Sequence, residues 1–320
     1  MCLSDDHSSS RGASTTTLRS TTMRKDGYRA SPIYPVKSFK VSEESPVLGL
    51  VLGTAVSIGT VIFSLFLPHV MTPQAAKEIY VPAFYSYDPL WHHFDNTIWT
   101  YGTDYALAVV MGTLAYRCLR AQSEATKLKR RAAGLLICYA LSVLAGGLAH
   151  QFYTTIEARN SLSFRILWTI CVGTVTAAGG FMGSSGSEVA RHFGGKVVPE
   201  WLWIGFGVFT TAICVCGYIS FQRPACDIFI AGITQVPPTA YMMGLGFFVL
   251  KNKVSEFYRW QCIVAFILNA PLLPMYSLLV HSTELSLATI NTLLHTWLLV
   301  AWGNQSLSLL HLISKVQKTE

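Results

Sequence analysis

Long, nearly uninterrupted apolar stretches constrain this chain more than any other feature. Its 320 residues are 51% hydrophobic and 13% charged, with a mean hydropathy of +0.40, whereas about a quarter of the residues in an average soluble domain are charged. About eight segments approach the roughly 20 apolar residues that a helix needs to cross a bilayer: 47–67, 104–119, 132–152, 164–182, 201–221, 229–250, 261–280 and 288–313. The sequence therefore predicts an all-α, polytopic transmembrane helix bundle of about eight spans, or seven.

The placement of basic residues predicts how such a bundle is oriented. With eight spans and a cytoplasmic N-terminal tail, the only Lys and Arg residues outside are Lys77, Arg159, Arg165 and Arg223. This distribution satisfies the positive-inside rule with both termini in the cytoplasm. Basic loops beside anionic lipid also explain the net charge of +7, so membrane lipids, and not nucleic acid, are the expected partners.

The chain divides by composition into two tails and a membrane domain. Residues 1–45 are rich in Ser, Thr and charge and predict a disordered cytoplasmic tail; an organelle transit peptide is the alternative, which the acidic residues disfavour. Residues 46–314 form the predicted transmembrane domain, and 315–320 a short cytoplasmic tail. We expect an integral, multi-pass protein of the plasma membrane or an endomembrane, with no cleavable signal peptide.

Three local patterns modify this picture. The predicted outer loop, 71–103, is unusually aromatic, which indicates an interfacial segment or, alternatively, a lid over a site below. Pro237-Pro238 and Pro271/Pro274 are expected to kink the sixth and seventh spans. The spacing Gly179-x-x-x-Gly183 predicts close helix packing and no chemistry.

Ionisable side chains inside the apolar segments are the best indication of a functional site, because each costs a few kcal/mol at membrane depth. Asp104 opens the second predicted span, His150 closes the third, and Asp227 begins another on the same outer side. Because a short inner loop joins the second and third spans, Asp104 and His150 are expected at one level. His295, in the last span, shares a helical face with Asn291, Trp302 and Gln305, and Tyr139 and Gly146 share a face with His150.

These residues permit two interpretations. Imidazole and carboxylate are both zinc ligands and acid/base groups, so Asp104, His150 and His295 are the candidate catalytic residues, and His150, His295, Asp104 and Asp227 the candidate metal ligands, with zinc as the candidate cofactor. Alternatively, the histidines are hydrogen-bonded interfacial residues, and Asp104 caps its helix next to Thr103.

The pattern Thr103-Asp104 at the start of one span and Gly146-Gly147-Leu-Ala-His150 at the end of the next resembles the CREST superfamily. That group of seven-span membrane hydrolases includes alkaline ceramidases and the progestin and adipoQ receptors. The resemblance implies a zinc site held by His and Asp residues and hydrolysis of a lipid amide. It carries over only His150, Asp104 and His295, because Gly146 stands where the family has Ser and Leu299 where it has a second last-helix His.

Three functions follow as hypotheses. The first is a non-catalytic receptor, scaffold or assembly factor, whose outer polar residues hydrogen-bond across the bundle. The second is a zinc-dependent lipid hydrolase of the ceramidase type. The third is a proton-coupled transporter or channel in which His295 and Asp104 line a polar path; a small-molecule or lipid ligand suits any of the three.

Overall fold

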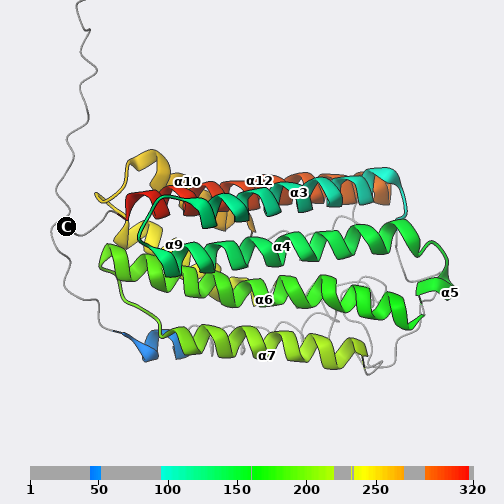
Figure 1. Cartoon of the computed structure of the whole chain (residues 1–320), viewed down its shortest axis with the longest axis horizontal. Coiled ribbons are helices and arrows are strands. Elements are labelled where there is room, and N and C mark those ends of the chain that lie inside the picture. The colour runs from blue at the N-terminus through cyan, green and yellow to red at the C-terminus, as the bar shows by residue number, and fades with distance from the viewer. Residues whose placement is uncertain are drawn as a thin grey trace, which may run out of the picture. The chain divides into compact units, whose positions relative to one another are not determined.

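The described part of the chain is helical. The computed structural model describes residues 44–51, 95–159, 161–219, 232, 234–269 and 285–316, all within the second of two compact units, 1–38 and 39–320. Within these ranges there is no β-strand, only an isolated bridge between Glu44 and Val197. The elements (Figure 1) are α3 Ile98–Arg120, α4 Thr126–Phe152, α5 Ile156–Arg159, α6 Leu162–Phe193, α7 Glu200–Ile219, α9 Val236–Gly244, η1 Leu245–Val249, α10 Glu256–Asn269 and α12 Leu287–Lys315. The predicted all-α class is confirmed for these residues.

Capping residues set the ends of the long helices. The Ser161 hydroxyl accepts a hydrogen bond from the backbone N–H of Phe164, 3.3 Å away, and Ser286 does the same for Thr289 at 3.2 Å. These bonds satisfy N–H groups that have no partner in the first turns of α6 and α12. Gly194 ends α6 in the left-handed region, with φ 71°, which glycine adopts without the strain of a side chain.

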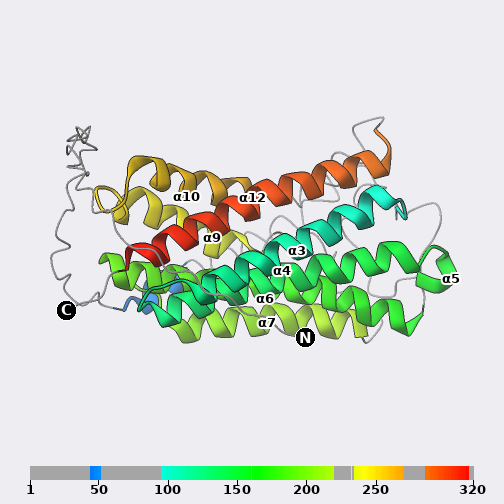
Figure 2. The same ribbon diagram turned by 45° about the horizontal axis from the view of Figure 1, so that its top comes forward.

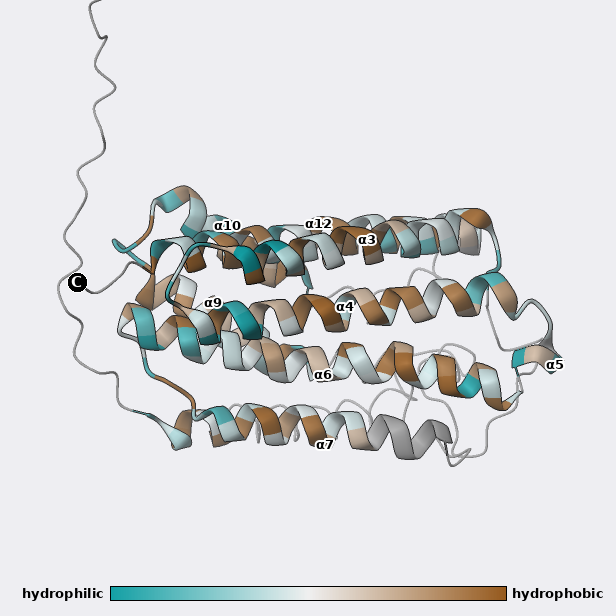
Figure 3. Cartoon of the chain, viewed as in Figure 1, coloured by the Kyte–Doolittle hydropathy of each residue, from teal (hydrophilic) through white to brown (hydrophobic). Residues whose placement is uncertain are grey.

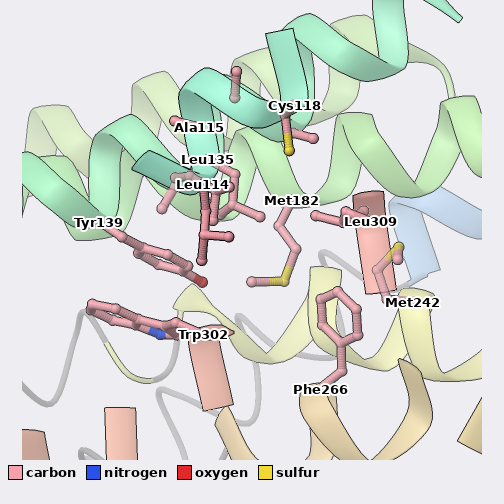
Figure 4. Packing of buried hydrophobic residues seen from close by; sticks show 14 of the residues in the cluster. Leu114, Ala115, Cys118, Leu135, Tyr139, Met182, Met242, Phe266, Trp302 and Leu309 are labelled. Carbon is pink, nitrogen blue, oxygen red and sulfur yellow. The ribbon is translucent and has the colours of Figure 1, made fainter. Parts of the chain in front are cut away.

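The helices of the second unit close into a ring. Helix α3 packs on α4, α4 on α6, α6 on α9, α9 on α10, α10 on α12, and α12 on α3 (Figure 2). Helix α7 packs on α6, outside this ring. Ser123 and Val316, which follow α3 and α12, share a 3.1 Å hydrogen bond, so these two helices run parallel. Large side chains from several helices meet within the ring (Figure 4), among them Tyr139, Met182, Phe266, Trp302 and Leu309.

The helical path of the predicted sixth span is interrupted just before its prolines: Gly232 and Thr234 are helical, Gln235 is a turn residue, and α9 begins at Val236. Pro237 and Pro238 occupy the first turn of α9, after Gln235. In a first turn the missing proline N–H leaves no helical bond unmade. In its described part, the span expected over 229–250 is therefore helical on both sides of an interruption at Gln235, and α9 continues into the π-helical η1. Pro271 and Pro274 lie outside the described residues.

Two helices in the described ranges are long and apolar enough to cross a membrane, α4 and α6. The apolar stretch Val236–Val249 is shorter. The predicted first span, most of the outer loop at 71–103 and the tail at 1–45 fall largely outside the described residues. The structure thus supports membrane-length helices at the third and fourth predicted spans, while an eight-span topology is a matter for proposal.

Glycines bring α6 and α7 into backbone contact. A Cβ atom added to Gly180 would lie 3.1 Å from Gly207 Cα and 2.9 Å from the Trp203 carbonyl oxygen. A Cβ on Gly183 would lie 2.1 Å from the Trp203 ring, and one on Gly179 would lie 3.0 Å from the Thr234 carbonyl oxygen. The predicted packing role of Gly179-x-x-x-Gly183 is confirmed.

Candidate functional site

Asp104 on α3 and His295 on α12 form a buried pair. Their residues are 2% and 9% exposed, and His295 Nε2 lies 3.3 Å from Asp104 Oδ1. The other ring nitrogen, Nδ1, lies 2.8 Å from the hydroxyl oxygen of Thr103. Two of the predicted site residues are therefore in contact, and both nitrogens of His295 face side chains of α3.

Asp104 does not cap its helix. Helix α3 begins at Ile98, so Asp104 lies in the second turn. The acidic group at the helix start is Asp95, whose carboxylate accepts hydrogen bonds from the Thr97 backbone N–H at 3.3 Å, the Thr97 hydroxyl at 2.8 Å and the Thr100 hydroxyl. The alternative that Asp104 caps its helix is therefore wrong. Asp95, Thr97 and Thr100 start α3 well before the apolar stretch 104–119 from which the helix was predicted.

His150 lies closer than Asp104 to the end of the bundle at which α3 begins and α4 ends. Its Nδ1 lies 2.6 Å from the Asp95 backbone oxygen, and its own carbonyl accepts a hydrogen bond from the Asn96 amide. Because α4 runs antiparallel to α3, the residues beside Asp104 are Gly146 and Gly147; a Cβ on Gly147 would lie 3.0 Å from Asp104 Cβ. The expectation that Asp104 and His150 stand level is therefore off by about one helical turn.

The predicted inward stripe of α12 is confirmed. Asn291, His295, Trp302 and Gln305 are all buried. Tyr139 and Gly146 on α4 are buried as well. The rings of Tyr139 and Trp302 stack in parallel, 3.9 Å apart with an interplanar angle of 2° (Figure 4).

A second buried polar cluster, formed by Tyr139, Gln235, Asn269, Trp302 and Gln305, was only partly visible in the sequence. Trp302 Nε1 donates to Asn269 Oδ1 at 2.9 Å. The Tyr139 hydroxyl lies 3.3 Å from Gln235 Oε1 and 3.4 Å from Gln305 Oε1. Sequence reasoning missed Gln235 and Asn269, although an amide next to prolines in an apolar segment was an available signal.

The four proposed zinc ligands do not assemble among the residues described. In this part of the chain no group of three or more His, Cys, Asp and Glu side chains is placed to hold a metal ion. Asp227 lies outside the described residues, and His150 stands about a turn from the Asp104–His295 contact. The arrangement that the structure does provide is a carboxylate, an imidazole and a hydroxyl in a buried row.

Comparisons with known proteins place the chain without assigning it an activity. No curated protein and no solved structure matches it. The model of a family of unknown function, DUF6962, matches residues 99–303, which include α3 through most of α12 and thus Asp104, His150 and His295. The resemblance to membrane hydrolases stays a prediction, because that family's description names no activity. Since the match extends over more than half of the chain, the protein belongs to the DUF6962 family.

Proposed function

We propose that the protein is a multi-pass integral membrane protein. Support comes from the outward faces of α3, α7 and α12 as well as those of α4 and α6. These faces carry large apolar side chains that nothing in the described part of the chain covers. Val109 on α3 is 69% exposed and Val208 on α7 is 63% exposed. Exposed apolar surface of this extent is rare on soluble monomers, whereas lipid chains would cover it. Other members of this surface are Ile137, Leu141, Ile166, Ile170, Ile204, Phe209, Leu293, Val300 and Leu307.

The basic end of the bundle supports a cytoplasmic N-terminus. Arg120, Arg131, Arg191, Lys253 and Lys315 lie at or near the helix ends that meet there, and hydrophilic residues concentrate at the same end (Figure 3). Cytoplasmic loops carry such an excess of Lys and Arg. The bridge from Glu44 to Val197, the 2.7 Å bond from Ser45 N to the Val197 oxygen and the ion pair of Glu44 with Arg191 place residues 44 and 45 at this end.

Within that frame we infer a non-catalytic receptor, scaffold or assembly role. The observation that carries this inference is that both ring nitrogens of His295 face α3, at 2.8 Å from Thr103 and 3.3 Å from Asp104. A zinc ligand needs an unshared nitrogen lone pair that points at the metal. The contacts of His295 and His150 instead link α12 and α4 to α3 and the segment before it.

Metal analysis tests this role against the zinc hydrolase. We expect protein purified in the presence of zinc to contain less than one equivalent of bound metal, and chelation to leave its thermal stability unchanged. Stoichiometric zinc that is lost in both His150→Ala and His295→Ala, while Asp95→Asn keeps it, would establish the hydrolase and refute the non-catalytic role. Tags on the N-terminus that are accessible only from the cytoplasmic side would support the topology.

Proton-coupled transport is the second candidate. One observation favours it: Asp104 Oδ2 is buried and has no hydrogen-bond partner in the described part of the chain. Polar groups of this kind inside membrane helices often mark ion or proton pathways. Proton flux into liposomes that requires both Asp104 and His295 would support transport; flux that persists in Asp104→Asn would count against it.

A further inference from the structure

The direction in which the Thr103 hydroxyl donates its hydrogen bond determines how many protons the Asp104–His295 pair holds. Its oxygen lies 2.8 Å from His295 Nδ1, 2.7 Å from the Trp99 carbonyl oxygen and 2.8 Å from the Thr100 carbonyl oxygen. A hydroxyl has one hydrogen and a carbonyl can only accept. The hydroxyl therefore donates its hydrogen either to a helix carbonyl or to His295 Nδ1. Each choice determines whether Nδ1 carries a hydrogen, and thus what Nε2, on the other side of the imidazole ring, can do.

In the first arrangement Thr103 donates to His295. Nδ1 is then the acceptor nitrogen, the ring proton lies on Nε2, and Nε2–H donates to the ionised carboxylate of Asp104 across the 3.3 Å contact. Histidine and aspartate together hold one proton. The backbone carbonyls lose nothing, because helix N–H groups already bond to them.

In the second arrangement Thr103 donates to the backbone. Nδ1 must then carry a hydrogen and donate it to Thr103, a choice that the Thr100 carbonyl beside the ring also favours. Nε2 and Asp104 Oδ1 would face each other as two acceptors unless a second proton lies between them. The pair therefore holds two protons, and rotation of one hydroxyl accommodates the change.

The other carboxylate oxygen of Asp104, Oδ2, is buried and has no hydrogen-bond partner among the described residues. A Cβ built on Gly146 would lie 3.6 Å from Oδ2 and 3.6 Å from Cys171 Sγ, so Gly146 on α4 and Cys171 on α6 border this oxygen. A buried carboxylate oxygen without a hydrogen bond to its charged form favours the protonated form of the group.

Several titratable groups surround the pair in the described part of the chain. Tyr105 on α3 and His150 on α4 are close enough to interact electrostatically with Asp104 and His295 respectively. Cys171 on α6 lies beside Gly146, on the Oδ2 side of Asp104, and Asp95 contacts His150 through its backbone oxygen. None of these carries a fixed positive charge. Arg159 is close enough to His150 to interact with it electrostatically.

From this geometry we propose that Asp104, His295 and Thr103 form a reversible proton-binding site, in which the Thr103 hydroxyl rotates when the pair takes up its second proton. The ligand is a proton. The inference stands apart from the receptor and transport roles, because a bundle with either function can bind a proton.

Infrared difference spectroscopy of the full-length protein in lipid nanodiscs tests the proposal. Between about pH 5 and pH 8, the range in which histidine-linked sites commonly titrate, we expect uptake of one proton with a change in carboxyl or imidazole bands. Asp104→Asn and His295→Gln should each remove this change. Asp95→Asn is the matched control, because it alters a carboxylate that Thr97 and Thr100 already satisfy.

Three milder variants keep the test informative if a charge-removing variant fails to fold. Thr103→Ser retains the rotating hydroxyl and should leave the titration unchanged, whereas Thr103→Val should move its midpoint by about one pH unit, a tenfold change in proton affinity. Gly146→Ala should retain both the fold and the titration, since its methyl fits at ordinary contact distances from Asp104 Oδ2 and Cys171 Sγ. Band changes that persist in Asp104→Asn, or in wild-type protein no pH-dependent change at all, would overturn the proposal.

Discussion

The contact of α6 with α7 and the contact of α12 with α3 join neighbouring helices by opposite means. Between α6 and α7, Gly180 and Gly207 allow the two backbones to touch, and the Trp203 ring covers the site of the absent Gly183 side chain. Between α12 and α3, side chains span the gap: His295 reaches both Asp104 and Thr103. One contact depends on the lack of side chains and the other on polar groups.

The difference separates packing from chemistry. Small residues let helix backbones approach closely enough for van der Waals packing to hold them together, and Gly180 and Gly207 provide this between α6 and α7. An ionisable group at membrane depth costs a few kcal/mol that such packing does not require. The Asp104–His295 pair is therefore the part of the bundle where a role beyond helix association is to be sought, whereas the glycine contact is structural.

Charged side chains introduced on the outward-facing surfaces of α3 and α7 are expected to have the largest effect on membrane insertion. Val109→Lys on α3 and Val208→Lys on α7 would each place an ammonium group in lipid, at a cost of about 2.5–3.5 kcal/mol to membrane insertion. The measurement is the fraction of protein that remains in membranes after alkaline extraction. Thr126→Lys, at the exposed first residue of α4, is the control; equal behaviour of all three variants would mean that these faces contact water.

Overpacking the glycine contact between α6 and α7 should have the second-largest effect. The new Cβ of Gly183→Ala would meet the Trp203 ring at 2.1 Å, so the helices must separate, at a cost of about 1–3 kcal/mol. Thermal unfolding in detergent measures the loss. A Cβ on Gly205 has no atom within 4 Å, so Gly205→Ala should be neutral or slightly stabilising; a neutral Gly183→Ala would show that α7 is free to move away from α6.

The sequence predicted the inward face of the last helix and grouped Asp104 with His295 in one candidate site, because polar residues are conspicuous against an apolar background. Asn291, His295, Trp302 and Gln305 repeat at helical spacing, and burial follows directly from that spacing. The direct contact of His295 with Asp104 depends on the parallel packing of α12 on α3, which the sequence pattern did not provide.

The level of His150 could not be predicted in the same way. It depends on where α3 begins, and the Asp95–Thr97–Thr100 hydrogen bonds that fix this start lie in a polar stretch with no apolar periodicity. Gln235 and Asn269 were missed for a related reason. Their partners, Tyr139 and Trp302, are far away in the sequence, and only the closure of the ring brings them together.

A double-mutant cycle should detect a smaller effect at the polar contact. We expect Asp104→Asn and His295→Gln to show a coupling energy of about 0.6 kcal/mol, and at most about 1.7 kcal/mol, the range for polar pairs between membrane helices. Unfolding free energies of the single and double variants provide the measurement. The control cycle combines Asp95→Asn with His295→Gln, whose effects on the unfolding free energy should be additive within about 0.5 kcal/mol. Equal coupling energies in both cycles would indicate that either substitution destabilises the whole end of the bundle at which α3 begins.

The smallest expected effect, from Thr103→Val, tests whether a polar contact to α12 contributes anything beyond helix geometry. Valine preserves the shape of threonine and removes the hydroxyl that His295 contacts at 2.8 Å, so we expect a loss of about 0.6 kcal/mol in unfolding free energy. Thr113→Val is a matched control on the same helix, because the Thr113 hydroxyl bonds only to the Val109 carbonyl of its own helix. If the two variants lose the same amount, the hydroxyl on α3 does not stabilise α12. A larger loss in Thr103→Val would show that α3 and α12 depend on polar side chains where α6 and α7 depend on their absence.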